Sequence, residues 1–297
     1  MILVTGATGT IGSEILRQLS ARGERVRAVT RDPARAQALP GVEVVRGDYG
    51  DSASMAAAMS GATAVFLVGV LGPDDIDTDR QLIATAVSAG VRRVVKLSAV
   101  GTGDPSLGRV GTWHLPGENS VRDSGLEWTI LRPSSFASNT LTWAEPLRAG
   151  QPVPNLSGTG VQGIVDPRDV AAVAVEALTG QGHSGMVYTL TGPELLSVPD
   201  QAAVLAGVLG REVAVVDVPE HAARAHMLAA GRSEEYADGA LAGQAYVRAG
   251  GNAVLTDHVT KVLGRAPRGY ADWAAAHATE FAAPEPTRAV TAAARTS

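Results

Sequence analysis

Short apolar runs alternate with longer segments of helical character along the first two thirds of the chain. The apolar runs are rich in valine and isoleucine, which is typical of buried β-strands. The expected strands are 1–4, 25–29, 42–45, 64–68, 92–97, 127–131 and 186–190. The expected helices are 11–22, 33–38, 52–59, 74–89, 112–124 and 168–179. Short strands separated by helices predict an α/β fold, a doubly wound parallel sheet of the Rossmann-like type.

The pattern changes after about residue 193, where the chain becomes mainly helical and rich in alanine. Expected helices there are 199–209, 219–230, 233–248 and 269–282, with one strand at 213–216. We therefore expect a dinucleotide-binding Rossmann domain over 1–192, with 137–165 contributing to the substrate cleft. A smaller, mainly helical substrate-binding lobe is expected over 193–283. The Pro/Ala/Thr-rich segment 284–297 is predicted to be a disordered tail.

Composition narrows the chemistry. The chain has 297 residues and a net charge of −5, which gives no reason to expect nucleic acid or an anionic membrane as a partner. It contains no cysteine, which excludes disulfides, thiol catalysis and Cys-ligated metals, and its histidines lack metal-ligand spacing. No apolar stretch is long enough to span a membrane. The N-terminal apolar run is short and has no basic flank, so we expect no signal peptide. We expect a cytoplasmic protein without a metal site. A homodimer is compatible with the sequence.

A glycine-punctuated turn lies between the first strand and the first helix. Gly6 allows a positive φ, Gly9 leaves no Cβ between the backbone and a phosphate, and Gly12 lets the helix sit close on the sheet. A turn of this kind presents backbone N–H groups and a helix N-terminus to a pyrophosphate. The spacing is G-x-x-G-x-x-G, and the alternative is a glycine-rich turn without a ligand. The predicted diphosphate-binding residues are Gly6, Thr8, Gly9, Thr10, Ile11 and Gly12.

The nucleotide is predicted from the residues that follow the next strands. Arg31 ends the strand at 25–29, where the ribose 2′ group should lie, and a guanidinium there favours NADPH over NADH. The alternative for Arg31 is a solvated surface side chain. Asp48 and Tyr49 follow the strand at 42–45 and are expected beside the adenine. Val68 and Gly69 are expected under the adenosine ribose.

Several motifs together resemble a known family, the NmrA-like branch of the atypical short-chain dehydrogenases/reductases. The chain looks most similar to the azoreductase and quinone oxidoreductase members of that branch, over roughly residues 1–283. The resemblance implies that Pro133 and Phe136 lie at the nicotinamide amide, and that the segment 166–169 is a structural helix start. The motifs are residues 5–12, 31–33, 47–48, 96–99, 124–133 and 166–170.

The usual catalytic pair of short-chain dehydrogenases is absent from the sequence. No tyrosine is followed four residues later by either lysine, Lys96 or Lys261. At the corresponding place the chain has His114 and Glu118, which the quinone-reductase-like branch shares. Pro116 predicts that the helix begins near it and leaves His114 just outside, so the His–Glu contact stays undecided.

Three residues are the candidates for catalysis: His114, Ser98 and Glu118. A histidine of near-neutral pKa can donate a proton to a reduced substrate or hydrogen-bond its oxygen. Ser98 follows the strand at 92–97, at the edge where open α/β sheets bind ligands. The alternatives are a histidine that only caps or packs and an ordinary strand-end serine.

These features predict an NADPH-dependent oxidoreductase that acts on a small conjugated acceptor, either quinone-like, azo-like or an activated carbonyl. Hydride transfer chiefly requires a positioned donor and acceptor. Such acceptors become stabilised anions that solvent can protonate, so a weak proton donor is tolerable. Two alternatives stay in competition: a non-catalytic NAD(P)-sensing regulator of the NmrA type, and a ketoreductase or dehydratase of secondary metabolism.

Overall fold

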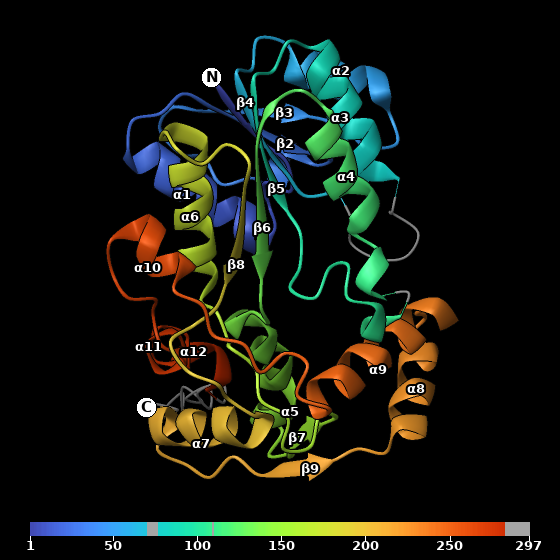
Figure 1. Cartoon of the computed structure of the whole chain (residues 1–297). Coiled ribbons are helices and arrows are strands. Elements are labelled where there is room, and N and C mark those ends of the chain that lie inside the picture. Colours follow the sequence, from blue (N-terminus) through green and yellow to red (C-terminus); the bar gives the residue numbers. More distant parts are fainter. Residues whose placement is uncertain (70–76, 109, 283–297) are drawn as a thin grey trace, which may run out of the picture.

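A parallel β-sheet forms the centre of the upper part of the molecule (Figure 1). The computed structural model describes residues 1–69, 77–108 and 110–282, and within them this sheet has seven strands in the order β3-β2-β1-β4-β5-β6-β8. This order confirms the predicted doubly wound, Rossmann-like α/β fold. The strands are β1 (Ile2–Val4), β2 (Val26–Thr30), β3 (Val42–Arg46), β4 (Ala64–Leu67), β5 (Arg93–Leu97), β6 (Glu127–Pro133) and β8 (Met186–Leu190).

Helices cover both faces of the sheet, which explains why its strands are apolar on both sides. One layer holds α1 (Thr10–Ala21) and α6 (Pro167–Thr179), and the other holds α2 (Ser52–Met59), α3 (Thr78–Ser88) and α4 (Leu115–Asp123) (Figure 1). Alternate residues of a strand point to opposite layers. In β5, Val95 joins the core beneath α1 and α6, whereas Val94 joins the core beneath α2 and α3.

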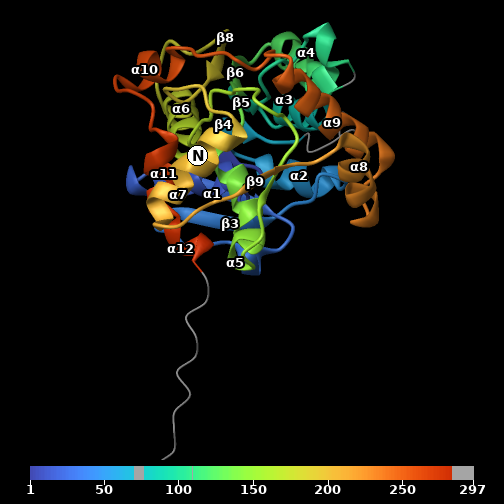
Figure 2. The same cartoon turned by 90° about the horizontal axis from the view of Figure 1, so that it is seen from below.

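The lower part of the molecule lies beyond the carboxyl ends of the strands (Figure 1). Its own core is built around Trp143, Leu205 and Trp273, all buried. Seen from below, α8 and α9 lie on one side and α7, α11 and α12 on the other (Figure 2). The elements are η5 (Ala137–Trp143), α5 (Ala144–Arg148), β7 (Val153–Asn155), α7 (Val198–Leu209), β9 (Val215–Asp217), α8 (Glu220–Ala229), α9 (Glu234–Arg248), α11 (Tyr270–Ala276) and α12 (Ala278–Phe281).

One late helix returns to the sheet. α10 (His258–Leu263) packs on α6, and its Val259 joins the core beneath α1 and α6. The chain that follows is fixed to the start of α6 by buried Asp169, which accepts hydrogen bonds from the side chains of Arg265 and Arg268. The domain boundary at 192/193 stays a prediction. The helices described after residue 193 lie in the lower part, except α10, which packs on α6 in the upper part (Figure 1).

Several expected elements differ from those observed. The helix expected at 33–38 is a single 3-10 turn, η1 (Pro33–Arg35), because the backbone is extended from Ala36. The helix expected at 269–282 is divided into α11 and α12 at His277. The elements α10, η5, α5 and β7 were not predicted. Residues 74–76 of the predicted helix 74–89, and all of the predicted tail 284–297, lie outside the described residues. No helix in the described ranges is long and apolar enough to cross a membrane.

Candidate active site

The glycine turn brings the start of α1 against β1. Gly6 has a φ of +60°, and the N–H of Gly9 donates to the carbonyl of Gly6 at 2.9 Å. A Cβ on Gly12 would lie 2.1 Å from that same carbonyl oxygen, so only glycine allows this approach. Thr8, Gly9 and Thr10 are exposed, and no side chain caps the N-terminus of α1. The turn therefore presents uncapped backbone N–H groups to solvent, an arrangement that fits a diphosphate.

Val68 and Gly69, expected under the adenosine ribose, follow the carboxyl end of β4, where Thr5 and Tyr49 hydrogen-bond to the backbone. The Thr5 hydroxyl donates to the carbonyl of Phe66 at 3.0 Å and accepts from the N–H of Val68 at 2.9 Å. The Tyr49 hydroxyl donates to the carbonyl of Val68 at 2.7 Å. Burial raises the pKa of Tyr49, so this phenol is a neutral group that holds the β4 end in place.

Arg31 and Asp48 stand at the carboxyl ends of β2 and β3, both exposed. The Asp32 carboxylate caps η1 and accepts from the N–H of Ala34 at 3.1 Å, an arrangement typical of Asp-Pro at a helix start. The Asp48 carboxylate accepts from the N–H of Gly50 at 3.0 Å and keeps a second oxygen available. The Asp32 carboxylate is thus engaged within η1, whereas Arg31 is exposed at the tip of β2.

Glu118 is the centre of a buried network. Its carboxylate accepts two hydrogen bonds from Arg132, at 2.8 and 2.6 Å, one from Arg122 at 2.8 Å and one from the Ser98 hydroxyl at 2.6 Å. Burial acts to raise the pKa of Glu118, but the hydrogen bonds from Arg132 and Ser98 outweigh it, and the pKa lies below its ordinary value. Glu118 is therefore an ionised anchor that ties α4 to β5 and β6.

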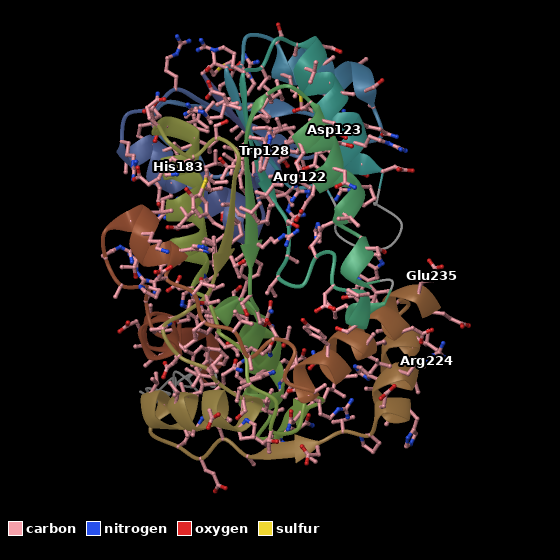
Figure 3. All side chains as sticks on the ribbon, in the orientation of Figure 1. Arg122, Asp123, Trp128, His183, Arg224 and Glu235 are labelled. Carbon is pink, nitrogen blue, oxygen red and sulfur yellow. The ribbon has the colours of Figure 1, made fainter. Side chains whose placement is uncertain are left out.

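Arg122 has a second contact that fixes it beside this network. Its guanidinium lies over the ring of Trp128 in β6, 5.7 Å from the ring centroid, and Figure 3 shows the two labelled side by side. Ser98 is buried and directly follows β5, and its hydroxyl donates its hydrogen bond to the Glu118 carboxylate. Its hydroxyl therefore supports the edge of the sheet and is poorly placed to give a proton to a substrate.

His114 is the N-cap residue of α4, as the Pro116 signal predicted. Its carbonyl accepts from the N–H of Glu118 at 3.0 Å, whereas the Glu118 carboxylate is bonded to Ser98, Arg122 and Arg132. Burial and the charge of Lys96 lower the pKa of His114 to about 3, with Glu118 acting in the opposite direction. A ring with this pKa is uncharged at neutral pH, so the structure does not provide the histidine of near-neutral pKa that proton donation would require.

The residues expected at the nicotinamide lie at the same edge of the sheet. Pro133 ends β6, and its carbonyl accepts from the N–H of Val100 at 3.0 Å. Phe136 follows and forms an isolated bridge with Val165. All the predicted positions thus gather at the carboxyl edge, although their contacts with a ligand remain predictions. Arg132, Arg122 and the Lys96–Asp79 ion pair at 2.6 Å were missed.

Residues 6–181 match a protein family described as NAD(P)H-binding. This chain belongs to that family. It is 42% identical over 284 residues to the (4-alkanoyl-5-oxo-2,5-dihydrofuran-3-yl)methyl phosphate reductase of Streptomyces griseus, covering 95% of this chain and 99% of the relative. It is 37% identical to the NAD(P)H azoreductase of Xenophilus azovorans, covering 95% of this chain and 100% of the relative.

A solved structure agrees with these relatives. An NADPH-dependent quinone oxidoreductase from Escherichia coli, complexed with NADPH, superposes with a TM-score of 0.82 at 27% identity, covering 93% of this chain and 99% of that one. These findings confirm the predicted resemblance to the azoreductase and quinone oxidoreductase members of the NmrA-like branch. The NAD(P)H-binding family member is thus an oxidoreductase that uses a nicotinamide dinucleotide.

Proposed function

We propose that the protein is an NADPH-dependent reductase that transfers hydride to a small conjugated acceptor, such as a quinone, an azo compound or an unsaturated carbonyl compound. The observation that carries this proposal is the protonation chemistry at the carboxyl edge. Among the described residues there, Glu118 is ionised, Ser98 donates to Glu118, and His114 is neutral. Such a site stabilises an anion by hydrogen bonding and leaves its protonation to water.

The relatives support this choice of acceptor. Their names specify a 5-oxo-2,5-dihydrofuran, an azo compound and a quinone. The dihydrofuranone and the quinone have a double bond conjugated with a carbonyl group, and an azo compound accepts hydride at nitrogen, so each gives an anion more stable than an alkoxide. An unactivated ketone would instead form a localised alkoxide, for which a general acid contributes about 10²-fold or more.

The geometry at the sheet edge supports the following binding roles. The turn from Gly6 to Gly12 binds the diphosphate and Arg31 the ribose 2′-phosphate. Asp48 accepts from the adenine amine, and Pro133 and Phe136 flank the nicotinamide, which supplies the hydride when bound. The ring N–H of His114 donates a hydrogen bond to the acceptor, and Glu118 and Ser98 hold α4 in place.

The function is tested by NADPH oxidation against a panel of quinones, azo dyes, conjugated lactones and saturated cyclic ketones. We expect kcat/KM for at least one conjugated class to exceed that for the saturated ketones by about 10²-fold or more, because no described group replaces the missing general acid. Turnover confined to saturated ketones would favour a ketoreductase. Micromolar NADP binding without any turnover would favour a nucleotide-sensing regulator.

Arg31 is expected to select NADPH. Replacing it with alanine should weaken NADPH binding by about 10-fold or more, because a hydrogen-bonded ion pair with the 2′-phosphate contributes roughly 1.5–3 kcal/mol. NADH, which lacks that phosphate, should bind almost as before. Calorimetric titration of both nucleotides measures the difference, and Arg25→Ala, an exposed arginine just before the start of β2, is the matched control. Equal losses for the two nucleotides would remove the case for Arg31.

A further inference from the structure

A buried ion pair joins β5 to α3 beside the proposed site. Lys96 is one of only two lysines in the chain, and its side chain is fully buried. Its ammonium lies 2.6 Å from the carboxylate of Asp79, in the first turn of α3, and donates to the carbonyl of Leu97 at 2.8 Å. Removing two charges from water is costly, so a buried pair of this kind is weak evidence of a purely stabilising role.

Two glycines allow the backbone to close on this pair. A Cβ on Gly117, in the first turn of α4, would lie 2.6 Å from a carboxylate oxygen of Asp79 and 2.7 Å from Cε of Lys96. A Cβ on Gly69, just after β4, would lie 2.4 Å from the other carboxylate oxygen. The first turn of α4 is therefore seated directly on the ion pair, with no room for a side chain between them.

His114 begins that turn. Its Nδ1 is enclosed and has no hydrogen-bond partner among the described residues. Since Nδ1 has no acceptor to donate to, the proton of the neutral ring is best placed on Nε2. The charged groups around the start of α4 are Lys96 from β5, Asp79 from α3, Glu118 from α4 and Arg132 from β6. Glu118 is already balanced by two arginines, Arg122 and Arg132.

We propose that Lys96 and Asp79 are positioning residues: their ion pair seats the first turn of α4, and burial together with the Lys96 charge keeps the enclosed His114 ring uncharged, so that Nε2–H hydrogen-bonds the acceptor without giving up its proton. The proposal rests on the proposed function, because it places His114 at the acceptor. The electron pair reaches the acceptor as hydride from the dinucleotide, and water supplies the proton that completes the reduction. The low pKa of His114 is consistent with this arrangement.

NMR titration of the histidine rings in the full-length protein tests the proposal, with the His114 signal assigned from H114Q. In the native protein we expect a neutral His114 ring throughout pH 5–8. In K96M the pKa of His114 should rise by about 1 or more, because the ring then loses the neighbouring positive charge that disfavours its protonation. In the double variant K96M/D79N the pKa of His114 should be lower than in K96M, because the negative charge left by the single substitution is also removed. The control is K261M, which removes an exposed lysine paired with Asp257 and should change nothing.

A native His114 pKa of 6 or higher overturns the proposal, whether or not K96M folds, and a folded K96M with unchanged titration does the same. A native value below 6 together with a higher value in folded K96M supports it. The titration requires no turnover, so it separates the two proposals. Absence of NADPH oxidation with every acceptor tested contradicts the proposed function. A His114 of ordinary pKa in an active enzyme contradicts only the role of Lys96.

Discussion

Replacing Glu118 with alanine is expected to lower the free energy of unfolding by about 3–5 kcal/mol, the loss typical when one partner of a buried ion pair is removed. The carboxylate is fully buried and holds Arg132, Arg122 and Ser98 together. Without it, two guanidinium groups lose their counter-charge and the Ser98 hydroxyl loses its acceptor. The anchor between α4 and the sheet is lost at the same time.

Urea unfolding followed by circular dichroism measures this loss. Glu127→Gln is the matched control: it removes another carboxylate bound to an arginine, Arg93, but one that is 54% exposed, so a loss below about 1 kcal/mol is expected. The loss for Glu118→Gln should lie between those of the other two variants, because glutamine retains the side-chain volume but lacks the charge. If Glu118→Ala costs no more than Glu127→Gln, the carboxylate is not the anchor inferred from the geometry.

Gly12→Ala is expected to impair both folding and dinucleotide binding. The new methyl would lie 2.1 Å from the carbonyl oxygen of Gly6, so α1 must move away from the turn. Overpacking of this kind costs about 1–3 kcal/mol. The displaced N–H groups should weaken NADPH binding by about 10-fold or more, which corresponds to roughly 1.4 kcal/mol.

Gly9→Ala separates the two effects. Gly9 has a φ of −87°, which any residue adopts, and a Cβ there would lie 3.3 Å from its nearest neighbour, the carbonyl oxygen of Gly6. The variant should therefore lose less stability than Gly12→Ala, while the exposed methyl obstructs the diphosphate. Thermal unfolding and calorimetry with NADPH measure both variants. Unchanged NADPH binding in Gly9→Ala would mean that the diphosphate lies elsewhere.

Local signals explain what could be predicted from the sequence. The glycine turn and the start of α4 near Pro116 each depend on a few neighbouring residues. Apolar runs separated by helices were sufficient for the doubly wound sheet, because parallel strands are buried on both faces. The extent of η1 was overestimated, since nothing local marks the extended backbone at Ala36.

The electrostatics of the site could not be predicted in the same way. Glu118 was recognised through its spacing from His114, yet its partners Ser98 and Arg132 come from β5 and β6. The low pKa of His114 depends on burial and on Lys96, whose position beneath α4 is set by tertiary packing. The scarcity of lysine in the chain was the one available signal that Lys96 is unusual.

The return of α10 to α6 has a consequence for how an acceptor enters. The backbone passes between the upper and lower parts after β6, before α6, after β8 and on both sides of α10 (Figure 1). A hinge works when a few residues absorb the whole rotation. Here any swing of one part would have to bend all these connections together and pull the Arg265 and Arg268 contacts off Asp169. Access to the nicotinamide edge should thus depend on local loop and side-chain motion, with the two parts turning as one body.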